Sequence, residues 1–257
     1  MRRPHFAATV RRSTSTVRGE ERLLDLAAGT ERVPATLLLP QGARSAPAAL
    51  LLHGFSSSKE RMAQSVGRAL QQRGIASLAL DLPFHGERDG GRDAIPYRNP
   101  LALVAAWTTA VREARGAIEW LTGQPEIDAG RIGALGYSLG GFLTLMMASE
   151  EPLVRAVTLA AAGDLPDTTP YAALVRRAVD PLRAARKLDG RPLLLVNGRR
   201  DTTTRPAQAE RLFAYAGEPK ELRWYDGGHW PPPSAIEDAA EWMARALRAT
   251  GVRRKAV

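Results

Sequence analysis

The sequence predicts an α/β fold in which a mostly parallel central sheet carries helices on both faces and a short cap insertion. Two observations lead to this prediction. Short apolar runs alternate with longer helical patterns along most of the 257 residues, which is typical of strands joined by crossover helices. Most of the expected strands are apolar throughout, as in parallel sheets that are buried on both faces.

The first expected elements are a tail and a β-hairpin. Residues 1–19 are basic, rich in Ser and Thr, and lack the apolar segment of a secretion signal, so we predict a flexible tail. Residues 22–26 and 33–39 are short strand-like runs on either side of a turn. The pattern then predicts, in order, a strand at 48–52, a helix at 59–73, a strand at 75–80, a polar loop at 81–98 and a helix at 101–121.

The second half continues the alternation. Residues 131–135 form an apolar run that leads into a glycine-rich turn, 136–141. Residues 163–190 are polar and contain several prolines, and we predict a small cap there with one short helix near 171–179. The remaining expected elements are a helix at 142–149, strands at 154–161, 192–196 and 221–225, and helices at 207–215 and 236–247. We expect one domain over residues 20–250, followed by a tail at 251–257.

Composition sets limits on the function. The chain has no cysteine, so it has no disulfide, thiolate zinc site or cysteine nucleophile. The net charge of +9 comes from arginines spread along the chain, which we interpret as an ordinary basic surface. A non-catalytic protein that binds nucleic acid is the remote alternative. We expect a cytoplasmic protein without a membrane span, because no apolar run approaches the required length.

The strongest functional signal is the turn Gly-Tyr-Ser-Leu-Gly-Gly at 136–141. It lies between an apolar strand and an apolar helix, where a tight turn exposes a serine hydroxyl at the end of the sheet. Glycines flank the serine because side chains there would clash as strand and helix close together. The pattern predicts that Ser138 is a nucleophile near the positive end of the following helix.

A serine nucleophile needs a base, because its free hydroxyl reacts poorly. Among four histidines, His229 lies in a glycine-rich loop after the last expected strand and completes the chain order serine, acid, histidine. We predict Asp201, in the turn after strand 192–196, as the acid that fixes the tautomer of His229. Asp164, which follows the preceding strand, is the main alternative.

Ester cleavage at a serine also needs two backbone N–H groups directed at the oxyanion of the intermediate. We predict that Leu139 provides one and Phe55 the other. His53 is interpreted as support for the loop that carries Phe55. Because no carboxylate spacing around His53 and His85 suggests a metal site, we expect no metal and no cofactor.

Four landmarks together resemble the α/β-hydrolase superfamily: His53-Gly54-Phe55 after a strand, residues 136–141, residues 197–201 and Gly227-Gly228-His229. The resemblance extends over nearly the whole chain. The segment Asp-Leu-Pro-Phe-His-Gly-Glu-Arg at 81–88 is similar to small bacterial esterases of the dienelactone hydrolase and prolyl-oligopeptidase-like branch. It implies a lone catalytic domain acting on small, accessible esters. Dienelactone hydrolases use a cysteine nucleophile, so lactone specificity does not follow.

Aromatic residues near these loops suggest a substrate pocket. Phe84, His85, Tyr137 and Trp230 neighbour the expected site and would form an apolar pocket for a small-molecule ester, although each would also suit an ordinary core. We favour a carboxylesterase. Peptide or amide hydrolysis and acyl transfer proceed through the same acyl-enzyme and are the alternatives.

Overall fold

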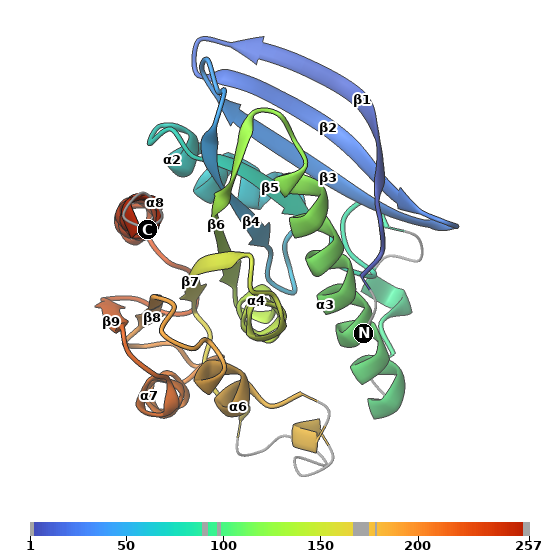
Figure 1. Ribbon diagram of the computed structural model, residues 1–257. Coiled ribbons are helices and arrows are strands. Elements are labelled where there is room, and N and C mark those ends of the chain that lie inside the picture. The colour runs from blue at the N-terminus through green and yellow to red at the C-terminus, as the bar shows by residue number, and fades with distance from the viewer. Residues whose placement is uncertain (1–2, 89–91, 97–98, 167–174, 178, 254–257) are drawn as a thin grey trace.

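A nine-stranded sheet runs through the computed structural model, which describes residues 3–88, 92–96, 99–166, 175–177 and 179–253 (Figure 1). The strand order is β1-β2-β3-β5-β4-β6-β7-β8-β9. The first three strands are antiparallel, and β5 to β9 run parallel with β4. The strands are β1 (Ala7–Thr16), β2 (Gly19–Ala28), β3 (Glu31–Pro40), β4 (Ala46–Leu52), β5 (Ala76–Leu80), β6 (Ile127–Tyr137), β7 (Val154–Ala160), β8 (Leu193–Gly198) and β9 (Lys220–Tyr225).

Helices cover both faces of this sheet. Figure 1 shows α2 and α8 on one side and α3 and α4 on the other, and each side has its own apolar core. The predicted fold class is therefore confirmed. The helices are α1 (Lys59–Met62), the π turn η1 (Ala63–Gly67), α2 (Arg68–Gln71), the 3₁₀ turn η2 (Arg92–Ala94), α3 (Pro100–Thr122), α4 (Leu139–Glu150), α6 (Pro181–Arg186), α7 (Pro206–Tyr215) and α8 (Pro233–Arg253).

Local sequence explains how these elements begin. The parallel strands β5 and β8 are buried at every residue, as their mostly apolar sequences predicted. Asn99 caps α3, where its side chain accepts a hydrogen bond of 3.1 Å from the N–H of Ala102, and Pro100 follows at the first helical position. Because β4 to β9 run parallel, their carboxyl ends lie at one edge of the sheet, where the loops of the site gather.

The prediction of a flexible tail at 1–19 is wrong. Residues Ala7–Thr16 form β1, which pairs with β2 from Ala7 to Thr16 with a register shift between Val10 and Arg12, and Phe6 is buried in the core. All ten residues of β1 are exposed, so the strand has no apolar alternation that would indicate it. Backbone hydrogen bonds to β2 and arginine ion pairs hold it in place.

Two further boundaries differ from the predictions. The expected tail at 251–257 begins too early, because α8 continues to Arg253. Within the expected cap at 163–190, residues 167–174 and 178 lie outside the described residues. The described part places Leu165, Val175 and Val179 in a small apolar cluster against Trp107 and Phe142. A cap at this position stays a prediction, as does the single-domain organisation.

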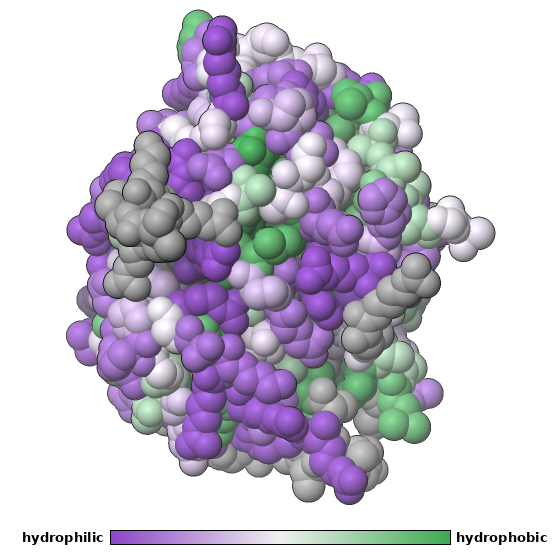
Figure 2. All heavy atoms as spheres, in the orientation of Figure 1, coloured by the Kyte–Doolittle hydropathy of each residue, from purple (hydrophilic) through white to green (hydrophobic). Residues whose placement is uncertain are grey.

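The visible surface is mostly hydrophilic. In the orientation of Figure 1, polar side chains dominate and apolar ones form small, separate patches (Figure 2). None of the described helices combines the length and apolar composition needed to cross a bilayer. The exposed large apolar side chains of the described residues are Val10, Val17, Leu101, Tyr215 and Trp230.

Candidate active site

Ser138 lies in the sharp turn between β6 and α4. Its backbone has φ 53° and ψ −118°, a strained conformation for a residue with a side chain. The flanking glycines permit the turn: a Cβ on Gly136 would lie 2.2 Å from the oxygen of Gly140, and one on Gly140 would lie 2.1 Å from the oxygen of Leu52. The strain holds the serine hydroxyl out at the carboxyl edge of the sheet.

The structure brings the three predicted side chains together. Nε2 of His229 lies 2.9 Å from the hydroxyl oxygen of Ser138, and Nδ1 lies 2.8 Å from Oδ2 of Asp201. Asp201 is buried, and the side chain of His229 is 18% exposed. Because a carboxylate oxygen can only accept, Nδ1 of His229 donates to Asp201. Nε2 is then free of its proton and can accept the proton of the Ser138 hydroxyl.

The second oxygen of Asp201 fixes the orientation of the carboxylate. Oδ1 accepts hydrogen bonds of 2.8 Å and 2.9 Å from the N–H groups of Thr203 and Thr204. The alternative acid, Asp164, instead pairs with Arg176 at 2.8 Å and 2.9 Å and with Arg211 at 3.3 Å. The geometry therefore favours Asp201 as the partner of His229.

Two tyrosines hold the backbone of His229. The hydroxyls of Tyr137 and Tyr225 each donate to the carbonyl oxygen of His229 at 3.3 Å. Burial and the charge of Asp201 raise the pKa of Tyr225 to about 12, and burial also raises the pKa of Tyr137, so both hydroxyls keep their protons at neutral pH. Sequence reasoning missed Tyr225, although its place at the end of the last strand, four residues before the histidine, was a signal.

The two predicted oxyanion donors lie at the start of α4 and in the loop after β4. Leu139 is the first residue of α4, so its N–H has no partner within the helix. Phe55 follows β4, and His53 controls the peptide that joins it to Gly54: Nδ1 donates to the carbonyl oxygen of Gly54 at 2.7 Å. Nε2 of His53 accepts from the N–H of Leu82 at 3.1 Å. Since a peptide is planar, holding the oxygen of Gly54 also fixes the direction of the N–H of Phe55.

His53 predicts a measurable pH dependence of stability. Burial lowers the pKa of His53 to about 4, from 6.5 in the unfolded chain. The unfolded chain therefore binds a proton more readily than the folded protein, and stability falls as pH decreases through this window. We expect His53 to contribute a loss of about 2 kcal/mol in the free energy of unfolding between about pH 7 and pH 5.

Urea unfolding at the two pH values measures this contribution. The variant His53→Asn should lose most of that difference, whatever its absolute stability. His5→Asn, in which an exposed side chain changes, should keep it. An unchanged difference in His53→Asn would show that His53 is not the titrating group.

The four predicted pocket residues line two separate cavities. Phe84 and His85 line a cavity of about 190 Å³, and Tyr137 and Trp230 line another of about 230 Å³ between α1 and α8. The first also includes Phe55 and Leu139, the predicted oxyanion donors. Ser138 and His229 are in the lining of neither cavity. The walls of the first are Phe55, Leu82, Pro83, Phe84, His85, Ile95, Leu103, Ala106, Trp107, Ala110, Leu139 and Leu143.

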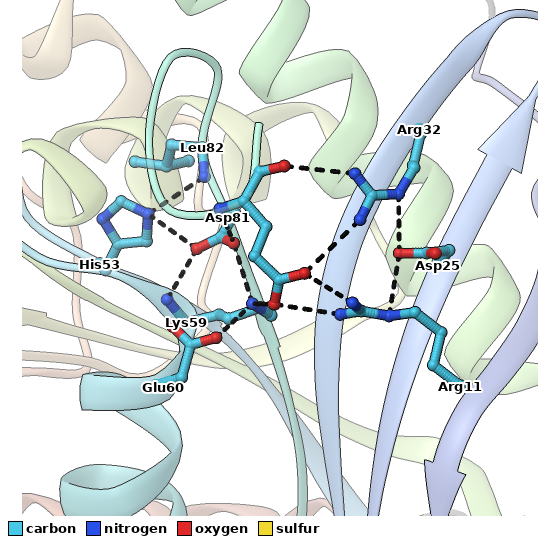
Figure 3. Close-up of polar contacts among 9 residues, drawn as sticks. Arg11, Asp25, Arg32, His53, Lys59, Glu60, Asp81 and Leu82 are labelled. Atoms are coloured by element: carbon cyan, nitrogen blue, oxygen red, sulfur yellow. Dashed lines mark hydrogen bonds and ion pairs between the residues drawn. The ribbon is translucent and has the colours of Figure 1, made fainter. Parts of the chain in front are cut away.

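Three carboxylates near this site surround a buried lysine. Among the described residues, Glu60, Asp81 and Glu87 are the one group whose geometry could hold a metal ion. Nζ of Lys59 lies 3.0 Å from Asp81 and 2.6 Å from Glu87, and it also donates to Glu60 (Figure 3). The ammonium of Lys59 already supplies the positive charge that a bound cation would otherwise bring to these carboxylates.

Comparison with known sequences identifies relatives. Residues 49–235 match the model of the alpha/beta hydrolase family. An uncharacterized protein of Mycobacterium tuberculosis is 28% identical over 195 residues, which is 73% of this chain and 64% of that protein. NocK of Nocardia uniformis, named provisionally as an esterase, is 33% identical over 167 residues, which is 64% of this chain and 44% of NocK. The chain thus spans less than two thirds of the length of these relatives.

Solved structures share the fold at low sequence identity. An acetyl xylan esterase from Paenibacillus has a TM-score of 0.75 and 19% identity, covering 96% of this chain and 89% of that one. A cold-adapted esterase from an Arctic intertidal metagenomic library has a TM-score of 0.73 and 20% sequence identity, and the match covers 92% of this chain and 98% of that one. Dienelactone hydrolase from Anabaena variabilis has a TM-score of 0.67 and 23% sequence identity, and the match covers 89% of this chain and 97% of that one. Residues 81–88 resemble the dienelactone hydrolase branch, and this solved member of the branch has the same fold as this chain.

Proposed function

The chain belongs to the alpha/beta hydrolase family, and we propose that within this family it is a serine esterase that cleaves small carboxylic esters through an acyl-enzyme. One observation carries the proposal: the hydrogen-bonded chain from the hydroxyl of Ser138 through His229 to Asp201, with steps of 2.9 Å and 2.8 Å. This is the arrangement in which a histidine can remove the serine proton as the oxygen attacks.

The proposed reaction has two halves. In the first, the oxygen of Ser138 attacks the ester carbonyl carbon while Nε2 of His229 takes the hydroxyl proton. The N–H groups of Phe55 and Leu139 stabilise the oxyanion. His229 then gives its proton to the alcohol oxygen, the ester C–O bond breaks and the acyl group remains on Ser138. In the second half, water repeats the attack with His229 as base, and the acid leaves.

Relatives support ester chemistry over other reactions of the same residues. The solved structures that share the fold include two esterases, and NocK is provisionally named as one. A polyketide transferase of Stachybotrys chlorohalonatus is also 32% identical over 120 residues, 47% of this chain and 37% of that protein. Transfer of the acyl group to an alcohol in place of water is the corresponding second candidate.

A substrate panel separates these candidates. Release of p-nitrophenol from acetate, butyrate and octanoate esters is compared with release of p-nitroaniline from the matching amides, each with and without added butanol. The proposal predicts ester cleavage with free acid as the product. Faster amide cleavage, or butyl ester as the main product, would replace esterase by amidase or acyltransferase.

The cavity beside the oxyanion donors is the proposed acyl site. Its volume of about 190 Å³ equals that of about six water molecules, which is room for a short or medium acyl chain. Ala106 of α3 lines this cavity, whereas its neighbour Ala105 does not. We expect Ala106→Phe to reduce kcat/KM for the octanoate ester by about tenfold or more relative to the acetate ester, because the longer chain loses its space.

Ala105→Phe is the control for this prediction, since it adds the same bulk one position away on the same helix. Its ratio of octanoate to acetate activity should match that of the wild type. A ratio unchanged in Ala106→Phe would place the acyl chain elsewhere.

A further inference from the structure

We propose that the N-terminal strand β1 positions the oxyanion hole, through a chain of contacts that begins at Arg11 and ends at the N–H of Phe55. Arg11 is thus assigned as a positioning residue that lies outside the catalytic group. The inference rests on the proposed function, because it assumes that Phe55 is an oxyanion donor. Figure 3 shows most of the contacts that connect the strand to the loop.

The first step joins β1 to the loop after β5. Arg11 donates two hydrogen bonds to the carboxylate of Glu87, at 2.6 Å and 3.1 Å. Arg32 of β3 donates to the carbonyl oxygen of Glu87 at 3.2 Å. Asp25 of β2 lies between the two arginines, 3.3 Å from Nε of Arg11 and 3.0 Å from Nε of Arg32. Three strands therefore fix both the side chain and the backbone of Glu87.

The second step transmits this anchoring to a buried charge. Glu87 accepts from Nζ of Lys59 at 2.6 Å, and the side chain of Lys59 is fully buried. A buried ammonium is tolerated only when carboxylates compensate it. The hydrogen bonds from Arg11, and then from Lys59, lower the pKa of Glu87 to about 2, so Glu87 stays charged at any working pH. Nζ of Lys59 also bonds to Asp81 at 3.0 Å.

The third step runs from Asp81 to the loop that carries Phe55. The carboxylate of Asp81 accepts from the N–H groups of Lys59 and Glu87, at 3.0 Å and 2.9 Å. The chain can close this tightly because residue 86 is glycine with φ 56°; a Cβ there would lie 2.1 Å from the carboxylate. The next residue, Leu82, donates to His53, and His53 holds the carbonyl of the peptide whose N–H belongs to Phe55.

A second contact connects the same loop to Phe55 directly. The ring of His85 packs edge-on against the ring of Phe55, with centroids 5.4 Å apart. Release of Glu87 would therefore loosen Phe55 from two directions, through His53 and through His85. Oxyanion donors act on charge that develops in the transition state, so a displaced donor lowers kcat with little effect on KM. Misplacement by about 1 Å can cost up to about 100-fold.

Arg11→Gln tests the proposal against a matched control. Arg12→Gln makes the same change in charge one residue along the same strand, and within the part of the chain that is described the side chain of Arg12 has no hydrogen bond or ion pair. We expect Arg11→Gln to lower kcat for p-nitrophenyl butyrate by about tenfold with KM nearly unchanged. Arg12→Gln should retain the wild-type kcat. Arg11→Lys should recover part of the loss, because lysine keeps the charge but not the two-pronged hydrogen bond.

The amide resonance of Phe55 gives a readout that needs no substrate. In ¹H–¹⁵N spectra, Arg11→Gln should shift this resonance and Arg12→Gln should not. Equal kcat values for the two variants, or a Phe55 resonance that does not respond to Arg11→Gln, would overturn the positioning role. Such a result would leave the proposed function intact if Ser138 remains essential, so failure of one can be told from failure of the other.

Discussion

Replacing Ser138 with alanine is expected to lower kcat/KM for p-nitrophenyl butyrate by about 10⁴- to 10⁶-fold. The reason is that the hydroxyl oxygen of Ser138 is the atom that attacks the ester. His229 lies 2.9 Å from that oxygen, and without the hydroxyl it has no serine proton to remove. What remains is the weak catalysis that the oxyanion hole and substrate binding provide alone. Steady-state kinetics on purified wild type and Ser138→Ala measure the loss.

The variant should fold normally, which makes the loss interpretable. The side chain of Ser138 makes no capping hydrogen bond to α4, so alanine is expected to change the free energy of unfolding by less than about 1 kcal/mol. Ser149→Ala, at the other end of the same helix, is the control and should keep full activity. Ester cleavage that survives in Ser138→Ala at the wild-type rate would exclude Ser138 as the nucleophile.

Asp201→Asn is expected to reduce kcat by about 10⁴-fold while the fold is retained. The N–H groups of Thr203 and Thr204 bind one oxygen of Asp201, and they will hold the amide oxygen of asparagine in the same place. The amide nitrogen then faces Nδ1 of His229 and donates to it. Nδ1 must become the acceptor, the proton moves to Nε2, and Nε2 can no longer take the proton of Ser138.

Asp164→Asn makes the same substitution at the alternative acid. Asp164 pairs with Arg176 and Arg211 and not with His229, so this variant is expected to lose stability and keep kcat. Kinetics on the two variants, beside their melting temperatures, separate the roles. A large loss of kcat in Asp164→Asn, with Asp201→Asn active, would reverse the assignment.

The turn around Ser138 could be predicted because everything that shapes it is local. A strand, two glycines and a helix within about fifteen residues dictate the conformation, whatever the rest of the chain does. The place of His229 followed from chain order for a related reason: successive parallel strands end at the same edge of the sheet. The choice between Asp201 and Asp164 depends on the fold, because both follow strands and only their partners in space distinguish them.

The strand β1 could not be predicted from local pattern. Its side chains are exposed on both faces, so the alternation of apolar and polar residues that marks a half-buried strand is missing. What holds it are contacts with residues far along the chain, such as Arg11 with Glu87. The buried Lys59 was missed for the same reason, since lysine is rarely buried and two of its carboxylate partners, Asp81 and Glu87, become its neighbours only in the fold.

The division of the predicted pocket also depends on the fold. Phe84, His85, Tyr137 and Trp230 are all close in sequence to site loops, which suggested one pocket. Tyr137 is the last residue of β6, and its side chain packs with the α8 face. Phe84 and His85 lie with α3 on the opposite side. Because the sheet separates two helical layers, residues that are all close in sequence to site loops can line cavities on opposite faces of the sheet.

Trapping the acyl-enzyme tests directly whether Ser138 is the nucleophile. The protein is mixed with p-nitrophenyl butyrate, quenched in acid within the first turnovers, digested and analysed by mass spectrometry. We expect one butyryl group on the wild-type peptide that contains Ser138. A butyryl group on any other residue, with the Ser138 peptide unmodified while p-nitrophenol is released, would contradict this expectation.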